Sequence, residues 1–274
     1  MSAALAAPAN NSSSAKQRIL TGLVLGGVFL AALLGLPTPA WGAVMLGIVA
    51  LGAWEWAGLV KFGARARIGY ALATPILALL VYQAAPREMI AAIAVVFWLL
   101  LAPLWLARGW PVPGGIGGAL LGWLLLVPTA YAAVHLHGHS PSFLLVCILL
   151  AVIADSAAYF SGRRFGRHKL APRISPGKSW EGALGAALAV AIYGALIGVF
   201  ALGESAENTA RLLGYALILF IASILGDLFE SHAKRQAGIK DSGNWLPGHG
   251  GVLDRIDSLS AVLPLALCFL LLWP

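Results

Sequence analysis

Uncharged apolar runs long enough to cross a lipid bilayer recur along the chain and restrict what it can fold into. Residues 89–107 and 115–136, for example, contain no charged side chain. Only 11% of all residues are charged and the mean hydropathy is +0.86, whereas soluble domains carry about 25% charged residues. Such runs indicate membrane-spanning α-helices, because a membrane β-barrel shows short alternating segments instead. The sequence therefore predicts an all-α fold, that of a polytopic integral membrane protein.

Joints that contain Pro, Gly or charged residues divide the apolar sequence into about nine predicted transmembrane helices. They cover residues 19–36, 40–60, 68–85, 89–107, 115–136, 141–161, 181–203, 209–232 and 258–273. Residues 1–18 precede them and are predicted to form a disordered tail, because most of that stretch is small and polar. We expect an N-terminal set of helices within 19–140 and a C-terminal set within 141–274 that carries the catalytic site.

The Lys and Arg residues are distributed very unevenly between the two ends of these helices. With the N-terminus inside, only Arg87 and Arg211 of the 18 Lys and Arg residues lie on the outer side. Cytoplasmic segments of membrane proteins carry the excess of positive charge. The sequence therefore predicts a protein of the bacterial inner membrane whose charged face, and active site, point into the cytoplasm.

Carboxylates lie inside the predicted helices close to this basic face. Asp155 and Asp227 each precede a cluster of basic residues by about two helical turns. Ionisable groups at membrane depth are unfavourable and usually mark function, although a buried ion pair that only supports packing stays an alternative. Asp254 and Asp257 stand three residues apart at the start of the last helix, where helix capping is the alternative explanation.

Together these groups suit a metal ion and a phosphorylated substrate. Mg²⁺ prefers oxygen ligands, often one or two carboxylates together with substrate phosphates, which Asp227, Asp254 and Asp257 could supply from two helices. Basic side chains beside such a site favour a polyphosphate, and the glycines of the "GHGG" turn let backbone N–H groups approach phosphate. In "SPGKSWEG", Ser175 and Pro176 predict the start of the seventh helix.

Three motifs resemble those of the phosphatidate cytidylyltransferases. They are "DSAAY", "SPGKSWEG" and the longer "SHAKRQAGIKDSGNWLPGHGGVLDRIDS", which ends at Ser258. Ala233 and Ser179 are mild departures from the family pattern. The resemblance implies transfer of the cytidylyl group of CTP to phosphatidic acid, which gives CDP-diacylglycerol and pyrophosphate. It also implies Mg²⁺ as cofactor and a homodimer among membrane lipids, and nothing in the sequence indicates nucleic acid as a partner.

The combined motifs and chemistry give each candidate residue an expected role. The expected metal ligands are Asp227, Asp254 and Asp257. The expected substrate-binding residues are Ser175, Lys234, Arg235, Lys240, Gly250, Gly251 and Arg255. The expected catalytic residues, whose individual roles stay open, are Asp155, Lys178, Glu181, Asp241 and His249.

Two other functions and two other features remain open from the sequence. A polyprenol kinase that uses CTP would show similar phosphate and metal groups. An ion-coupled transporter would use Asp155 and Asp227 as ion sites, although such proteins tend to show internal repeats. Glu55 lies near the inner side and either faces the site or pairs with an Arg. His135, His137 and His139 lie on the outer side, where a Zn²⁺ site is a minor alternative.

Overall fold

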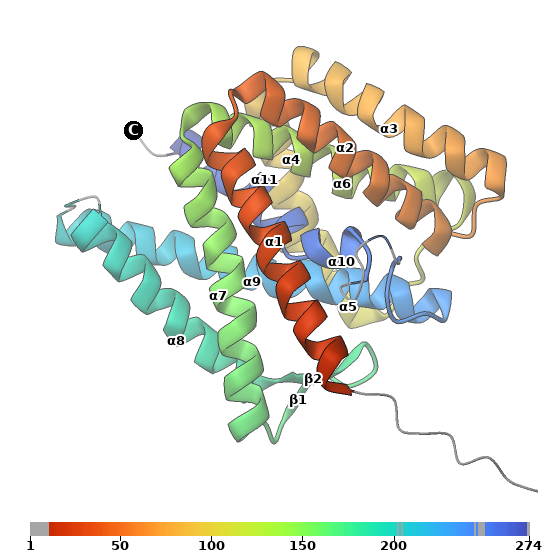
Figure 1. The fold of residues 1–274 in the computed structure, drawn as a ribbon. Coiled ribbons are helices and arrows are strands. Elements are labelled where there is room, and N and C mark those ends of the chain that lie inside the picture. The colour runs from red at the N-terminus through yellow and green to blue at the C-terminus, as the bar shows by residue number, and fades with distance from the viewer. Residues whose placement is uncertain (1–10, 202, 204, 244, 246–249, 273–274) are drawn as a thin grey trace, which may run out of the picture.

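Long helices make up most of the chain in the computed structural model, which describes residues 11–272 except 202, 204, 244 and 246–249 (Figure 1). The helices are α1 (Asn11–Gly35), α2 (Thr38–Leu59), α3 (Ala64–Ala84), α4 (Arg87–Val95), α5 (Ala102–Arg108), α6 (Gly115–His139), α7 (Pro141–Phe165), α8 (Trp180–Leu196), α9 (Ala206–Ala237), α10 (Leu253–Ile256) and α11 (Leu259–Leu272). Two π-helical segments, η1 (Val96–Leu101) and η2 (Ile197–Ala201), continue α4 and α8. A short antiparallel hairpin, β1 (Lys169–Ala171) and β2 (Ser175–Ser179), joins α7 to α8.

The predicted polytopic helical fold is confirmed. Within the described residues, 8 helical segments are long and apolar enough to cross a membrane, and they match the second to ninth predicted helices. The first predicted helix corresponds to α1, which includes the apolar stretch Gly22–Gly35. Residues 1–10 of the predicted tail lie outside the described residues, and α1 begins at Asn11, ahead of the predicted start.

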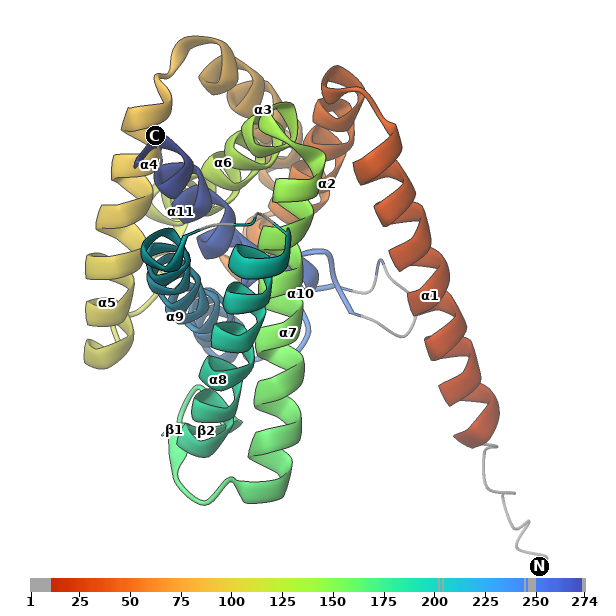
Figure 2. The same ribbon diagram turned by 90° about the vertical axis from the view of Figure 1, so that its left-hand side faces the viewer.

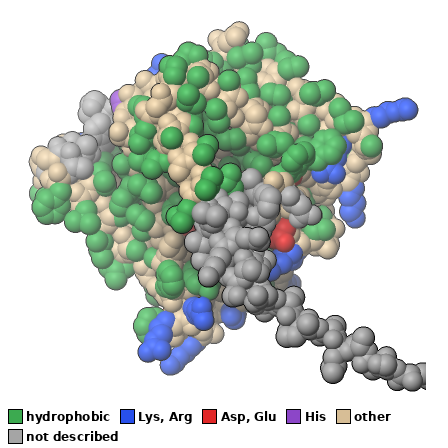
Figure 3. Space-filling model, viewed as in Figure 1, with side chains coloured by type: hydrophobic (Ala, Val, Ile, Leu, Met, Phe, Trp, Pro, Cys, Tyr) green, Lys and Arg blue, Asp and Glu red, His purple; other side chains and the backbone are tan. Residues whose placement is uncertain are grey.

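The apolar surface of the bundle is that of a membrane protein. Large exposed hydrophobic side chains run along the outer faces of α1, α3 and α8. The face in Figure 3 is mostly hydrophobic, and most of its visible Lys and Arg side chains lie along the lower and right-hand margins. Exposed apolar patches this extensive would be unfavourable in water, so these faces are suited to contact with lipid tails.

Helix α11 occupies the centre of the bundle and joins its two halves. It packs against α6 and α4 from the N-terminal set and against α9 and α7 from the C-terminal set. All residues from Ser260 to Leu267 are buried. By contrast, α1 runs along the outside of the bundle (Figure 2). The two predicted sets of helices therefore share one core.

Serine caps and left-handed glycines set the ends of the helices around the hairpin. The Ser140 hydroxyl accepts from the Phe143 N–H at the start of α7, and Ser179 accepts from Gly182 at the start of α8, both at 3.2 Å. Gly238, with φ of 79°, ends α9. The prediction that Ser175 and Pro176 begin the seventh helix is wrong. They lie in β2, where proline is tolerated because both strands of a two-stranded sheet are edges.

Of the three outer histidines, His137 holds the ends of neighbouring helices together. His137 is buried, and its Nε2 donates to the Leu33 carbonyl at 2.9 Å, so its Nδ1 accepts from the Thr38 hydroxyl at 3.1 Å. Its ring also stacks on Trp41. In the part of the chain that the structure describes, no group of three or more His, Cys, Asp or Glu side chains is placed to bind a metal. The zinc alternative is therefore not supported.

A glycine allows α6 to pack closely against two aromatic side chains. Trp56 donates to the Gly118 carbonyl at 2.8 Å, and the Tyr70 hydroxyl donates to the Ala119 carbonyl at 2.9 Å. A Cβ atom at Gly122 would collide with both aromatic side chains. The close approach thus satisfies both buried polar atoms and fixes α2 and α3 against α6.

We predict that Gly122→Ala lowers the thermal denaturation midpoint in detergent, because overpacking a well-packed core costs about 1–3 kcal/mol. The matched control is Gly47→Ala on α2, where a Cβ atom would meet nothing within 4 Å. There the higher helix propensity of alanine favours the fold by about 1 kcal/mol. Equal midpoints for the two variants would contradict this account of the packing.

Candidate active site

A cavity of about 530 Å³ lies where α7, α8, α9 and the hairpin meet. This volume falls in the usual range for small-molecule sites, about 300–1,000 Å³. Its polar lining includes Asp155 from α7, Asp227 from α9 and Lys178 from β2. Apolar side chains such as Phe220 and Ile224 line the remainder. The cavity therefore offers one charged end and one apolar wall.

Two carboxylates, Asp155 and Asp227, line the charged end of this cavity, and a third, Asp257, is close enough to interact with both. The Lys178 ammonium lies 2.5 Å from one carboxylate oxygen of Asp227, and the Ser231 hydroxyl donates to the other at 3.2 Å. Asp155 is close enough to Asp227 to repel it electrostatically and to Lys178 to attract it. Asp257 repels both Asp227 and Asp155. Lys178 pairs directly with Asp227 and attracts Asp155, whereas Asp257 is attracted by Lys234, so the negative charge exceeds the positive charge here, which favours a bound cation.

Close helix packing brings these carboxylates together. A Cβ atom at Gly226 would collide with the Asp257 carbonyl and lie 3.1 Å from the Ser258 Cα. A glycine at this position therefore lets α9 approach the start of α11, which sets Asp227 beside Asp257. On the other side, a Cβ atom at Gly182 would lie 2.8 Å from the Ala158 carbonyl. That glycine lets α8 approach α7 and keeps Lys178 near Asp155.

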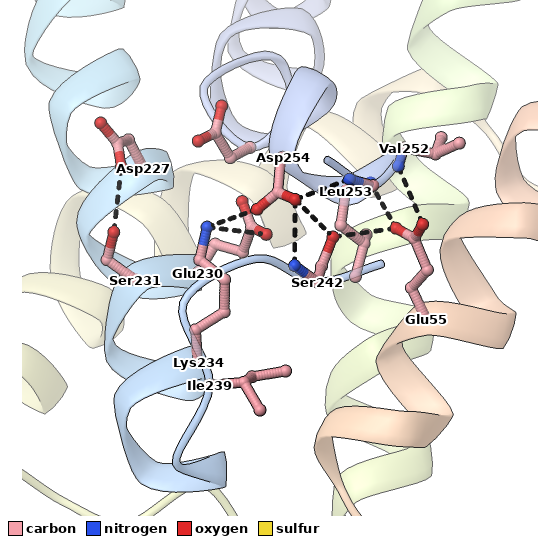
Figure 4. Close-up of polar contacts among 12 residues, drawn as sticks. Glu55, Asp227, Glu230, Ser231, Lys234, Ile239, Ser242, Val252, Leu253 and Asp254 are labelled. Carbon is pink, nitrogen blue, oxygen red and sulfur yellow. Dashed lines mark hydrogen bonds and ion pairs between the residues drawn. The ribbon is translucent and has the colours of Figure 1, made fainter. Parts of the chain in front are cut away.

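Asp254 belongs to a second polar cluster, next to the cavity (Figure 4). One of its carboxylate oxygens accepts from the Lys234 ammonium at 2.6 Å. The other accepts from the backbone N–H groups of Ser242 and Gly251 at 2.9 and 2.8 Å, and from the Ser242 hydroxyl at 3.0 Å. Lys234 also lies 3.3 Å from Glu230 and is only 8% exposed. Asp254 therefore orients a buried lysine and part of the chain between α9 and α10.

The three expected metal ligands have different surroundings. The sequence groups Asp254 with Asp227 and Asp257, because residues three apart on one helix share a face. Asp257 is repelled by Asp227 and Asp155, whereas both oxygens of Asp254 accept from donors of the protein. The expected ligand set stays a prediction, and Asp155 is a further candidate beside Asp227 and Asp257.

Several expected phosphate-binding groups are already engaged within the protein. Lys234 is absent from the residues that line the cavity, and the Gly251 N–H donates to Asp254. Gly250, with φ of 80°, adopts a left-handed conformation that favours glycine. Arg235 is exposed and donates to the carbonyls of Ile174 and Ile239, both at 3.3 Å. The direct phosphate contacts expected for Lys234 and Gly251 stay predictions, and they would require both groups to exchange their contacts with Asp254.

The remaining expected residues lie at the cavity or on the exposed surface near it. Ser175 lines the cavity. Lys240, Asp241 and Arg255 are exposed, and His249 lies outside the described residues. Glu181 does not line the cavity. It accepts from the backbone N–H groups of Arg167 and His168 and pairs with the His168 ring at 2.6 Å. Glu181 therefore anchors the hairpin to the first turn of α8.

The sequence-based site omits some cavity residues. Arg163, Lys169 and Gly177 all line it. In the sequence analysis, Arg163 and Lys169 serve only to predict which side of the membrane their loop faces. Arg163 follows Asp155 by eight residues along α7, a little over two helical turns toward the basic end of that helix. This spacing was the one signal that could have assigned it to the site.

Comparisons with known proteins agree with the motifs. Residues 16–273 match the cytidylyltransferase family. The chain belongs to that family. A Pseudomonas aeruginosa protein named phosphatidate cytidylyltransferase is 40% identical over 264 residues, which cover 91% of this chain and 94% of that protein. A Haemophilus influenzae protein of the same name is 38% identical over 280 residues, with 91% and 96% covered. Similarity to the cytidylyltransferases therefore extends across both sets of helices.

We predict that Glu181→Ala loosens the hairpin of this cytidylyltransferase. Two backbone N–H groups lose their carboxylate acceptor, and a hydrogen bond contributes about 0.5–1.5 kcal/mol. Tryptic cleavage after Lys169 and Arg173 in detergent should accelerate about 2- to 10-fold. The control is Glu207→Ala, which removes an exposed ion pair with Arg211 at the start of α9 and should leave hairpin cleavage unchanged. Equal rates in wild type and Glu181→Ala would argue against the anchoring role.

Proposed function

We propose that the protein transfers the cytidylyl group of CTP to phosphatidic acid and releases pyrophosphate. The observation that carries this proposal is the cavity between α7, α8, α9 and the hairpin, which joins a carboxylate–lysine cluster to an apolar wall. A phosphorylated lipid has the same two-part character. The family membership and the names of the two relatives described above point to the same reaction.

The reaction needs little acid–base chemistry from the protein. A phosphate oxygen of phosphatidic acid attacks the α-phosphorus of CTP, and a new P–O bond forms while the bond to the departing pyrophosphate breaks. The lipid phosphate is already an anionic nucleophile, so no strong general base is required. The main barrier is the repulsion between two anions, which cationic groups relieve most effectively at the charge that develops on pyrophosphate.

The cavity residues divide this work by position. Lys178 lies beside the carboxylates, while Arg163 and Lys169 also line the cavity and place positive charge where phosphates would bind. Ser175 offers a hydroxyl, and Gly177 leaves the backbone accessible because a Cβ atom there would meet nothing within 4 Å. The apolar wall would receive the start of the acyl chains.

We further propose Mg²⁺ as the cofactor, held by Asp227 and Asp257 with Asp155. The fit rests on the donor chemistry, since three carboxylates repel one another and, of the three, only Asp227 forms a direct ion pair, with Lys178, among the described residues. No metal cluster is preformed among the described side chains, so Lys178 would exchange its contact with Asp227 for one with phosphate. When bound, the ion would withdraw negative charge from the phosphate oxygens.

The comparisons do not favour the two other functions that the sequence leaves open, a CTP-dependent polyprenol kinase and an ion-coupled transporter. A CTP-dependent kinase would leave only phosphate on its lipid, and a transporter would leave CTP intact. We also propose that the protein is a homodimer in the bacterial inner membrane with its cavity facing the cytoplasm. The charge distribution supports this orientation, and the exposed apolar stripe Trp180, Leu184, Leu188 and Ile192 on α8 offers a surface for a second copy.

We predict that purified protein in detergent converts cytosine-labelled CTP and phosphatidic acid into a labelled lipid only when Mg²⁺ is present, and that EDTA stops the reaction. Label that stays out of the lipid while γ-phosphate enters it would establish a kinase instead. Asp227→Asn and Asp257→Asn should each lower kcat/KM at least about 100-fold, as expected for loss of charged groups at the reacting centre.

The same assay distinguishes a carboxylate that binds the metal ion from one that only holds other groups of the protein in place. Asp155→Asn should lower activity and raise the Mg²⁺ concentration needed for half-maximal rate if Asp155 belongs to the metal site. Asp254→Asn should lower activity without that shift, because its carboxylate holds Lys234, Ser242 and Gly251. The opposite pattern would restore the ligand set expected from the sequence.

We predict that Arg173→Cys and Lys240→Cys react with a membrane-impermeant thiol reagent only in inverted vesicles, and that Arg87→Cys reacts only in intact cells. All three positions are exposed in the structure. The native Cys147 is buried and Cys268 is half-buried within spanning helices, which limits background labelling. Labelling of Arg173→Cys in intact cells would overturn the proposed orientation.

A further inference from the structure

Glu55 is a charged side chain buried in the N-terminal half of the protein, away from the cavity lining. It lies on α2 and has no exposed surface. Among the described residues it forms no ion pair with Lys, Arg or His. The sequence leaves two roles open for Glu55, facing the site or pairing with an Arg. Neither role describes its surroundings in the structure. A buried carboxylate without a counter-charge needs strong hydrogen bonds to be tolerated.

The hydrogen bonds come from the segment that carries Asp254. One oxygen of Glu55 accepts from the Val252 N–H at 3.0 Å, and the other accepts from the Leu253 N–H at 2.8 Å. The second oxygen also lies 3.0 Å from the Ser242 hydroxyl. Figure 4 shows the Glu55 carboxylate pointing directly at this backbone. All three partners can donate, which suits a carboxylate because it only accepts.

Two glycines enclose the carboxylate so tightly that no side chain would fit. A Cβ atom at Gly251 would lie 2.5 and 2.6 Å from the two Glu55 oxygens. A Cβ atom at Gly243 would collide with the same carboxylate. The chain therefore approaches Glu55 from both ends of the α9–α10 connection. This packing is independent of the hydrogen bonds and indicates the same close fit.

The contact continues from Glu55 to the groups beside the cavity. The Ser242 hydroxyl lies 3.0 Å from both Glu55 and Asp254. Asp254 in turn holds the Lys234 ammonium at 2.6 Å. Leu253, which donates to Glu55, begins the short helix that leads to Asp257. A single side chain on α2 thus holds the backbone on which both Asp254 and Asp257 depend.

We propose that Glu55 is a positioning residue for cytidylyl transfer. It touches no cavity-lining group, and it acts by fixing the backbone at Ser242 and at Val252–Leu253, which orients Asp254 and Asp257. The catalytic part of this inference rests on the proposed function, whereas the contact itself can be tested without any substrate.

The test compares Glu55→Gln with wild type in detergent. Glutamine has nearly the same shape but places an NH₂ donor against groups that also donate. Amide hydrogen exchange of the peptide that contains Val252 and Leu253 should accelerate about 10- to 100-fold, as expected when hydrogen bonds to a charged group are lost. Peptides from α7 should keep their exchange rates. We expect kcat to fall about 10-fold or more, with the KM for phosphatidic acid changed less than about 2-fold, because Glu55 contacts no substrate.

Two further variants make the result decisive. Glu88→Gln, at an exposed position at the start of α4, is the matched control and should leave exchange and activity unchanged. Ser242→Ala removes the hydroxyl whose single proton lies between Glu55 and Asp254, and should give a smaller change in the same direction. It carries the test if Glu55→Gln does not fold.

Three outcomes would overturn the proposal. Unchanged amide exchange at Val252–Leu253 would show that Glu55 does not hold this backbone. Equal acceleration in every peptide would show that Glu55 contributes only to global stability. Faster local exchange with normal kcat would separate the contact from the reaction. A wild-type protein without transfer activity would refute the proposed function and the catalytic part of the inference, while the exchange data would still decide whether Glu55 holds this backbone.

Discussion

Charges at membrane depth must find their partners inside the protein, and this requirement organises the C-terminal half of the structure. Lys178 pairs with Asp227 across the cavity, while Lys234 is shared between Glu230 and Asp254. Glu55, which has no cationic partner among the described residues, uses backbone N–H groups instead. Because most of these contacts join different elements, the pairing also determines how α2, α9, α10 and the hairpin sit together. The same groups would be poorly stabilised if any one of these helices were displaced.

The carboxylates form two clusters that differ in how fully the protein satisfies their oxygens. Asp155, Asp227 and Asp257 repel one another and have few internal partners, which leaves them suited to bind a cation. Asp254 has both oxygens occupied by internal donors. Fully satisfied polar networks stiffen a structure, whereas partly satisfied groups keep capacity for a ligand. The second cluster can therefore fix the geometry of the first without taking part in binding.

The sequence predicts the helical class, the order of the helices and the general location of the site, because hydropathy and charge determine them directly. It fails where geometry depends on a local break. Ser175 and Pro176 have the residue types of a helix start, yet pairing with β1 places them in a strand and leaves Ser179 as the cap. The partners of Glu55 lie 187 to 198 residues away, and no local pattern in one sequence reports such a distance.

The burial of α11 has a consequence for how the protein is made. This helix follows the helices that surround it in chain order, and chains grow from the N-terminus at about 5–20 residues per second. The surrounding helices must therefore enter the membrane before their central partner exists. Until α11 arrives, α6 and α9 lack the surface against which they pack, and Asp257, just before α11, is missing beside Asp227 and Asp155. Completion of the core and assembly of the carboxylate cluster are thus one event in biogenesis, which prevents a half-made chain from carrying a finished site.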